Sequence, residues 1–469
     1  MHGTHHAKRA AKSAAPVAAA DPVGTDGTEA TAPAAAGPAI LDHDFDVAYL
    51  TRVEGEGTLR LRVRDGDVVE ARLSIFEAPR YFEQLVVGRT PDEVIDIVAR
   101  ICGICPVAYQ MSAVHAFEHG FGITVDPQVR ALRRLLYCGE WIQSHALHIY
   151  LLHAPDFLGY PSAIAMAADH QAIVERGLAI KKVGNRLLSL IGGRSIHPIS
   201  VRVGGFSKMP KPADFDEIRR SLDEAVDAAR ETVRMVAGFD APAFSREANL
   251  VALVHPSEYP YNEGRIVSTD GLDIPVDRWD DAFEEIHVED TNALQARTRS
   301  GGVYLLGPAA RITLASSTLH PLAADALEAT GLREQIRTNI YWSIVARAVE
   351  LLHACAEARD IIDAYRRPAE PKVAWTSQPG RAAWATEAPR GLLFHRYEVD
   401  ERGFIAAAQI VPPTSQNQVA IEADLTAFAP SVLELPHEVA THKLEQLIRS
   451  YDPCISCATH FLDVRIDRD

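Results

Sequence analysis

Alternation between hydrophobic and polar positions is the first pattern along the chain, and it indicates a β-hairpin. Apolar residues alternate with arginines over residues 59–64, Asp65-Gly66 supplies a turn, and the alternation resumes over residues 69–75. A period of two residues places the apolar side chains on one face of a sheet, and Asp-Gly is a favoured hairpin turn. We therefore predict that structure begins near residue 43 with a small β portion that buries one face.

The next pattern is typical of a short helix that leads into a pair of cysteines. Thr90-Pro91-Asp92-Glu93 combines an N-cap residue, a proline at the first helical position and a capping-box glutamate. Apolar residues then recur at helical spacing up to Ile101, and Gly103 is expected in the left-handed conformation of a helix C-terminus. Cys102 and Cys105 are therefore predicted to lie at a helix end, where side chains can converge.

Most of the remaining chain has the period of amphipathic helices. Such patterns cover residues 128–153, 163–191, 214–238, 320–366 and 437–450. Residues 239–316 mix short strand-like runs with turns, and Pro453 is expected to stop the last helix because proline cannot continue one. The predicted fold class is α+β and predominantly helical, a long helical bundle with a small N-terminal β portion.

The composition is that of a folded protein with an acidic exterior. The chain has 469 residues, of which 47% are hydrophobic, and its formal net charge is −16. This charge argues against a nucleic-acid-binding surface. We find no apolar run long enough to cross a bilayer and no export signal, so we expect a cytoplasmic protein without a membrane span. Residues 1–42, rich in alanine and proline, are predicted to form a disordered arm.

Cysteine positions indicate a metal site. Four of the six cysteines form two CxxC pairs, whereas Cys138 and Cys355 lie alone in apolar helical stretches and are predicted to be buried small hydrophobes. Two pairs supply four soft sulfur ligands, which suit zinc, iron clusters, copper(I) or nickel. About 350 residues separate the pairs, far more than in ordinary structural zinc sites. Spacing alone leaves a catalytic metal, a structural zinc and redox disulfides open, in decreasing order of preference.

The sequences around both pairs resemble the metal-binding signatures of [NiFe] hydrogenase large subunits. Residues 100–105 read RICGIC, and residues 452–460 read DPCISCATH. Further family motifs occur in the family's order, at residues 52–55 (RVEG), 192–198 (GGRSIHP) and 387–391 (EAPRG). The resemblance extends from about residue 45 to 460, and the chain is most similar to alpha subunits of cytoplasmic bidirectional NAD(P)-linked hydrogenases of the sulfhydrogenase type.

This resemblance implies a catalytic domain over residues 43–460 that cleaves H2 reversibly and heterolytically. It implies a nickel ion bound by all four thiolates, with Cys102 and Cys454 terminal. Cys105 and Cys457 would bridge to an iron that carries one CO and two cyanide ligands. The proton released from H2 would leave on Cys454.

Four further residues match family positions around this centre. Glu54 would take the proton from Cys454, although such a glutamate at a hairpin edge is otherwise a surface residue. Arg390 would lie above the open metal position and contact a cyanide, where the alternative is an arginine that caps a turn. Asp452 would orient Arg390 through a charge-assisted pair. Thr414 would hydrogen-bond the second cyanide.

Glu83 and His460 match residues that hold a magnesium ion near the family's C-terminus. The histidines at positions 145, 148 and 153 match family histidines and are expected to be structural hydrogen-bonding groups. Two positions depart from the family pattern: Tyr109 replaces a common histidine, and Ser144 replaces a common aspartate. Such changes alter the groups that tune the metal ligands.

The resemblance also implies partner proteins. Two cysteines remain after the nickel–iron ligands, too few for the usual ligation of an iron–sulfur cluster, and no dinucleotide fingerprint is present. Electrons would therefore leave through a small subunit with Fe–S clusters, and further subunits would carry FAD and the NAD(P) site. A maturation protease would remove residues 461–469.

Three other interpretations share part of this pattern. The quinone-pocket subunit of respiratory complex I has the same fold but generally lacks the paired cysteines. A noncatalytic H2 sensor or metal-binding homologue would share every ligand and differ in turnover and partner. A zinc-stabilised scaffold would unfold when Cys454 is replaced by serine.

Overall fold

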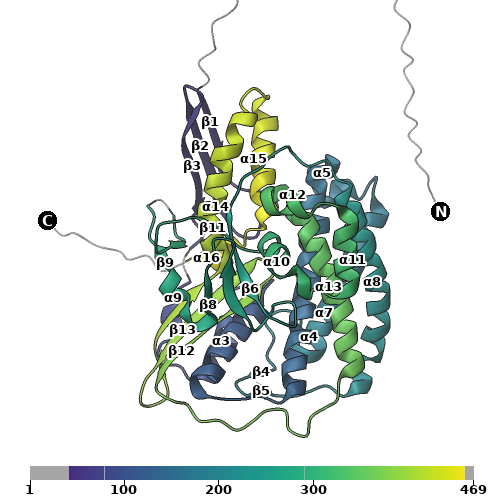
Figure 1. Ribbon diagram of the computed structural model, residues 1–469, viewed down its shortest axis with the longest axis vertical. Helices are drawn as coiled ribbons and strands as arrows, with labels where there is room; N and C mark the ends of the chain where they lie inside the picture. The colour runs from purple at the N-terminus through teal and green to yellow at the C-terminus, as the bar shows by residue number, and fades with distance from the viewer. Residues whose placement is uncertain (1–41, 79, 290, 460–469) are drawn as a thin grey trace, which may run out of the picture. The chain divides into compact units, whose positions relative to one another are not determined.

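The predicted N-terminal hairpin is present as part of a three-stranded antiparallel sheet. The computed structural model describes residues 42–78, 80–289 and 291–459. Strands β1 (His43–Val47), β2 (Gly57–Arg64) and β3 (Asp67–Ile75) pair in that order. The apolar side chains of β2 are buried and share a hydrophobic cluster with α14 (Pro413–Phe428) and α15 (His437–Tyr451), which lie beside the sheet in Figure 1.

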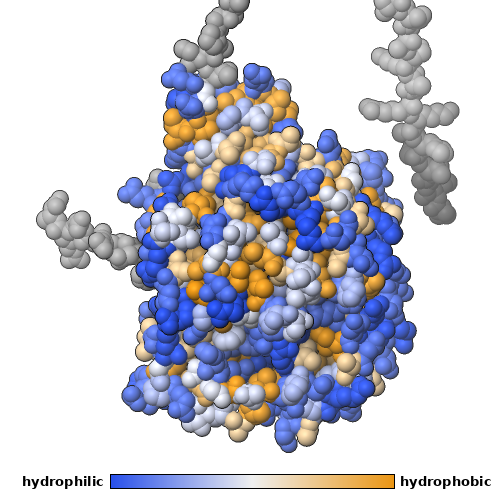
Figure 2. Space-filling model, in the orientation of Figure 1, coloured by the Kyte–Doolittle hydropathy of each residue, from blue (hydrophilic) through white to orange (hydrophobic). Residues whose placement is uncertain are grey.

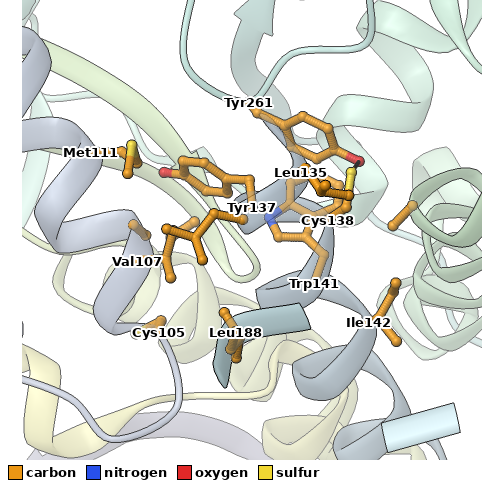
Figure 3. Packing of buried hydrophobic residues seen from close by; sticks show 14 of the residues in the cluster. Cys105, Val107, Met111, Leu135, Tyr137, Cys138, Trp141, Ile142, Leu188 and Tyr261 are labelled. Atoms are coloured by element: carbon orange, nitrogen blue, oxygen red, sulfur yellow. Dashed lines mark hydrogen bonds between the residues drawn. The ribbon is translucent and has the colours of Figure 1, made fainter. Parts of the chain in front are cut away.

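Four long helices form the bundle that the hydrophobic period predicted. They are α4 (Pro127–Leu147), α7 (Gln171–Gly192), α8 (Asp216–Ala237) and α13 (Ser343–Ala364), and Figure 1 shows them side by side. The outer side of α8 is largely hydrophilic in Figure 2, as expected for the solvent face of an amphipathic helix. Cys138 and Cys355 are fully buried in this bundle, which confirms their prediction as core residues, and Figure 3 shows Cys138 beside Tyr261.

Helices α4 and α7 approach closely because each has a glycine at the contact. A Cβ atom at Gly184 would lie 2.6 Å from the carbonyl oxygen of Gly139 and 2.7 Å from the backbone nitrogen of Gln143. Both atoms belong to the α4 backbone, so they cannot move aside as a flexible side chain could. The absence of a side chain at Gly184 therefore sets the separation of the two helices.

Replacing Gly184 by alanine is expected to lower the free energy of unfolding by about 1–3 kcal/mol, because overpacking outweighs the better helix propensity of alanine. Denaturant-induced unfolding followed by circular dichroism measures this change. Ser189→Ala is the matched control, because Ser189 is exposed on α7 and its hydroxyl bonds only to the carbonyl of Asn185. An unchanged unfolding midpoint for Gly184→Ala would show that the helices can separate without loss.

A sheet near the C-terminal third of the chain lies outside the sequence prediction. Strands β12 (Gly380–Ala388), β13 (Gly391–Val399) and β14 (Ile405–Val411) pair antiparallel in that order, and α3 (Pro106–Phe121) packs against the first two. Much of β12 and β13 is buried on both faces, so the alternation that identifies a half-exposed strand is missing. The overall fold class, predominantly helical α+β, is confirmed.

The remaining elements are shorter. A four-stranded sheet has the order β11-β6-β7-β8, from Tyr304–Leu305, Asn249–Val254, Arg265–Ser268 and Asp273–Pro275. Two-stranded pairs are β4–β5 (Val201–Arg202, Gly205–Phe206) and β9–β10 (Phe283–Ile286, Gln295–Thr298). Short helices are α1 (Phe82–Leu85), α5 (Ala154–Leu158), α6 (Ala163–Met166), α9 (Trp279–Ala282), α10 (Pro308–Ala315), α11 (Pro321–Thr330), α12 (Arg333–Thr338) and α16 (Ile455–Ala458), and His148–His153 is a π-helix.

The helix before the first cysteine pair is shorter than predicted. Helix α2 (Pro91–Val98) has the predicted capping box between Thr90 and Glu93. It ends at Val98, and the following residues form a tight turn before the cysteines. Gly103 does not have the left-handed conformation, so that prediction is wrong. The pair lies instead between two helices, with Cys105 immediately before α3.

Across residues 42–459, apart from positions 79 and 290, we find no helix that is both long and apolar enough to cross a bilayer. The predicted N-terminal arm before residue 42, His460 and the predicted maturation peptide 461–469 lie outside the described residues.

Candidate metal centre

The two cysteine pairs, 352 positions apart, meet in the protein interior. The sulfur atoms of Cys102 and Cys454 are 3.4 Å apart, and those of Cys105 and Cys457 are 3.7 Å apart. All four sulfurs lie within 4.8 Å of one another, and all four residues are buried. The fold thus gathers four soft ligands from opposite ends of the sequence at one point.

The sulfur positions fit a shared metal ion. All four cysteines are free, and their shortest separation, 2.7 Å between Cys454 and Cys457, exceeds the roughly 2.05 Å of a disulfide. With metal–sulfur distances of about 2.3 Å, two ligands of one ion lie at most about twice that distance apart. Four thiols at this spacing match a soft metal and do not match ligation of magnesium or calcium.

The pKa values of the four buried thiols are shifted in opposite directions. Hydrogen bonds from the other three cysteines hold the pKa of Cys102 well below its usual value, whereas burial raises the pKa of Cys454 and Cys457. The hydrogen bond to Cys102 likewise raises the pKa of Cys105. One thiolate is therefore stabilised by the cluster itself, and a cation is the partner that would allow the others to ionise.

Glu54 lies directly against the second cysteine pair. Its Oε2 is 3.1 Å from Cys454 Sγ and accepts the backbone N–H of Ser456 at the same distance. Its carbonyl oxygen accepts the N–H of Ile455 at 2.8 Å. These contacts fix the carboxylate beside one sulfur, and they distinguish Glu54 from the exposed Glu56 two residues later.

Arg390 occupies the two-residue turn between β12 and β13 and is almost fully buried. Its Nη2 lies 2.9 Å from Asp452 Oδ1, its Nε donates to the Asp452 carbonyl, and its Nη1 is 3.4 Å from Ser144 Oγ. Burial acts to lower the pKa of Arg390, but Asp452 and the cysteine sulfurs outweigh it and raise that pKa well above its usual value. Arg390 is therefore a fixed cation beside the sulfurs.

Asp452 also shapes the path of the chain into the second cysteine pair. It adopts a left-handed conformation with φ of 55° and ends α15. The last carbonyls of that helix, at Ser450 and Tyr451, each accept a hydrogen bond from buried Arg347 at 2.9 Å. Burial lowers the pKa of Arg347 to about 10. Nothing in the local sequence pointed to Arg347, which lies about 100 residues away on α13.

Two further contacts hold the cysteine segments in place. Thr414 Oγ1 accepts the backbone N–H of Cys454 at 3.0 Å. Arg80 Nη2 donates to the carbonyl of Ile101 at 2.7 Å and to that of Ser456 at 2.5 Å, so one guanidinium joins the two ligand segments. Thr414 was predicted from its sequence context, whereas Arg80 was not, because a single arginine in a loop has no signature of such a role.

Glu83 lies at a cavity beside the second pair. The cavity has a volume of about 330 Å³, and Cys457 and Thr459 also line it. Glu83 Oε1 accepts the backbone N–H of Ile410 at 2.7 Å. His460, the other residue matched to a magnesium site, lies outside the described residues. The structure therefore brings Glu83 close to the C-terminal segment.

The histidines on α4 and the following π-helix make buried polar contacts. His145 Nε2 lies 3.0 Å from Glu350 Oε2, His148 Nε2 lies 2.8 Å from the Arg449 carbonyl, and His153 Nε2 lies 3.3 Å from Ser450 Oγ. The contacts of His148 and His153 are hydrogen bonds and support their expected structural role, whereas His145 lies close to Glu350 without hydrogen-bonding geometry.

Tyr109, where the family commonly has histidine, is buried near the sulfurs. Burial and the charges of neighbouring cysteines, Cys457 first among them, raise the pKa of its hydroxyl well above the usual value. The ring lies 5.7 Å from that of His395. The tyrosine is therefore a neutral neighbour of the sulfurs.

A buried ion network supports the hairpin that carries Arg390. Arg311 forms two hydrogen bonds with Glu350, at 2.7 and 2.8 Å, and one with Glu387 at 2.8 Å, and all three side chains are fully buried. Arg311 also donates to the carbonyls of Ala388 and Pro389. Burial alone would raise the pKa of Glu350, but Arg311 lowers it to about 2. Of the three charged residues in this network, Arg311 and Glu350 lie outside the family motifs, whereas Glu387 opens the motif at residues 387–391.

Comparisons with known proteins agree with this arrangement. The chain matches the family described as nickel-dependent hydrogenase over residues 80–177 and 306–460. It is 33% identical to sulfhydrogenase 2 subunit alpha of Pyrococcus furiosus, over 89% of this chain and 99% of that protein. It is 28% identical to NAD-reducing hydrogenase HoxS subunit beta of Cupriavidus necator, over 88% of this chain and 94% of that protein.

Similarity extends to the three-dimensional structure. The crystal structure of an NAD+-reducing [NiFe]-hydrogenase in the H2-reduced state matches with a TM-score of 0.77 and 27% identity, over 89% of this chain and 99% of that one.

Proposed function

The chain belongs to the nickel-dependent hydrogenase family, and from this premise we propose that its four buried thiols hold a nickel–iron centre that carries CO and cyanide on iron. The protein is a [NiFe] hydrogenase subunit, an oxidoreductase that acts on H2. The observation that carries the proposed assignment of residues is the convergence of four cysteine sulfurs with Glu54 Oε2 at 3.1 Å from one of them.

A nickel–iron centre of this kind supplies reversible heterolytic cleavage of H2. Side chains of this protein then bind and transfer the proton. The sulfur of Cys454 holds it, and Glu54, at hydrogen-bonding distance, accepts it and passes it outward. Cys102, like Cys454, would bind nickel alone, and Cys105 and Cys457 would be shared between nickel and iron.

The neighbouring groups hold this arrangement. Arg390, oriented by Asp452, supplies a fixed guanidinium beside the sulfurs and would contact one cyanide. Thr414 fixes the backbone of Cys454 and would donate its hydroxyl hydrogen to the second cyanide. Glu83, with His460, holds a magnesium ion beside the C-terminal segment.

The proposal includes partner proteins and a place in the cell. A small subunit with Fe–S clusters takes the electrons, and flavin-containing subunits pass them to NAD(P). The similarity to a sulfhydrogenase alpha subunit and to a subunit of an NAD-reducing hydrogenase supports this proposal. Residues 43–460 form the catalytic domain, and a maturation protease removes residues 461–469. Because NAD(P) is the proposed acceptor, we place the complex in the cytoplasm.

Infrared spectroscopy tests the proposed centre. The protein is purified anaerobically from a host with the maturation machinery, and bands of iron-bound CO and cyanide are expected. A folded, tail-processed protein that contains zinc and lacks these bands would refute the proposal.

Glu54→Gln is expected to slow exchange between D2 and protons of water by roughly 10²–10⁴-fold, the usual contribution of a general acid–base group. The amide keeps the size of the side chain but cannot accept and release the proton. Mass spectrometry of the evolved gas measures the rate, and nickel content is expected to stay unchanged. Glu56→Gln, at an exposed position, is the control, and equal rates for both variants would exclude Glu54 from proton transfer.

A further inference from the structure

One face of α4 carries three polar side chains that reach the backbone around the first cysteine pair and Arg390. Glu140, Gln143 and Ser144 are spaced by three and four residues, so they share a face of the helix. Figure 3 shows the start of α3, with Cys105 and Val107, beside the core side chains Tyr137 and Trp141 of α4. None of the three polar residues belongs to a recognised motif of the metal signatures.

Glu140, which lies on the neighbouring helix α4, caps the N-terminus of α3. Cys105 stands at the N-cap position of α3, and its side chain makes no capping hydrogen bond. The N–H groups of Val107 and Ala108, in the first turn, donate to Glu140 at 2.6 and 3.1 Å. These are groups that an N-cap side chain ordinarily satisfies. A carboxylate from a neighbouring helix therefore does the capping while the Cys105 thiol lies among the other sulfurs.

Gln143 binds the loop between the two cysteines. Its Nε2 donates to the carbonyl of Ile104 at 2.6 Å. Ser144, the next residue, reaches Arg390. Gln143 therefore holds the loop through the carbonyl of Ile104, and Glu140 holds the first turn of α3 that follows the loop.

Helix α4 is a suitable template for this role. Glu140 is fully buried and Gln143 nearly so, and the helix contacts both α7 and α13 in the bundle. The close approach of Gly184 fixes the backbone of α4 at Gln143 itself. A displacement of the cysteine loop would therefore have to break buried hydrogen bonds, since the helix cannot follow it.

We propose that Glu140, assisted by Gln143, is a positioning residue that fixes Cys102 and Cys105 for metal binding. This inference rests on the nickel–iron centre proposed above. It adds that the geometry of the first ligand pair is set by α4 and is not intrinsic to the CxxC segment. Groups that orient ligands typically change metal affinity or activity by roughly 10–100-fold when removed.

Two variants test the proposal. Glu140→Met keeps an unbranched side chain of similar size but removes both acceptors, and Glu140→Gln keeps one. Nickel and iron per chain, measured by elemental analysis of anaerobically purified holoprotein, are expected to fall about tenfold or more in Glu140→Met and less in Glu140→Gln. The infrared bands of iron-bound CO and cyanide in Glu140→Gln are expected to shift from their wild-type positions.

Glu422 provides the matched control. It also accepts a backbone N–H, that of Leu73 at 3.1 Å, and lies on α14 about 12 Å along the helix from Thr414. Glu422→Gln and Glu422→Met are expected to keep wild-type metal content and band positions. A general loss of buried carboxylate hydrogen bonding would affect both positions alike.

The outcomes separate the two proposals. Missing bands in the wild-type protein would refute the proposed centre, whatever Glu140 does. If the wild-type protein shows the bands and Glu140→Gln has the same metal content and the same band positions, the positioning role is overturned. This holds even if Glu140→Met fails to fold. Equal shifts in Glu140→Gln and Glu422→Gln would overturn it as well.

Discussion

Replacing Cys454 by serine is expected to abolish H2 turnover and nickel binding and to leave the protein folded. A hydroxyl is a hard and weakly acidic ligand, so it cannot replace a thiolate on nickel. The variant also removes the sulfur that faces Glu54 at 3.1 Å. The loss should exceed the roughly 10–100-fold caused by removing a group that only orients a ligand. Elemental analysis and H2-dependent dye reduction measure it.

Folding is expected to survive because Cys454 is a single small member of an extensive hydrophobic cluster. Extensive hydrophobic clusters hold the bundle and the N-terminal sheet together. Circular dichroism checks this expectation, and Cys355→Ser, in the core of α13, is the control that should keep its metal. An unfolded Cys454→Ser chain that has lost zinc would instead support the zinc scaffold. A fully active variant would exclude Cys454 as a ligand.

Arg311→Met is expected to give the largest loss of stability, about 3–5 kcal/mol in the free energy of unfolding. The change leaves the buried carboxylates of Glu350 and Glu387 without their shared cation. It also removes the donors to two carbonyls of the turn that carries Arg390. Denaturant unfolding at neutral pH measures the loss.

The effect should depend on pH in a defined direction. Because the pKa of Glu350 is lowered to about 2, its ion pair contributes fully above the ordinary value of about 4.3 and is lost as the pH falls through 2. The stability difference between wild type and Arg311→Met should therefore narrow in acid. Arg337→Met removes exposed ion pairs with Glu247 and Glu334, and it should change the free energy of unfolding little. An unchanged free energy of unfolding for Arg311→Met would show that other groups offset the cost of burying the two carboxylates.

Local patterns predicted the elements whose two faces differ. The hairpin of β2 and β3 alternates and the helices of the bundle are amphipathic, so both are readable from the sequence. The β12–β14 sheet was missed because its strands have no period of two. Strands β12 and β13 are largely buried on both faces, and β14 contains a run of three alanines. The end of α2 was misplaced because a turn after Val98, and not a glycine, stops it.

Candidate site residues also fall into two groups, those that a local sequence pattern identifies and those that only the folded structure reveals. The cysteines, Glu54, Arg390 and Asp452 lie in short segments with recognisable neighbours, and the structure brings them together. Arg80, Glu140 and Arg347 act on backbone groups of residues that are distant in sequence. No local pattern encodes such a contact, because it exists only once the helices have packed.

The distance between the two cysteine pairs also has a consequence for biogenesis. At ordinary rates of translation, the 352 residues between Cys102 and Cys454 take roughly 20–70 s to synthesise. During that time the first pair, with α3 and α4, can fold on the nascent chain while half of the ligand set does not yet exist. Zinc fingers, by contrast, fold only when the metal binds. Here the four-sulfur ligand set is complete only after Cys454 and Cys457 have been synthesised, so binding by all four thiolates can only follow synthesis of nearly the whole chain.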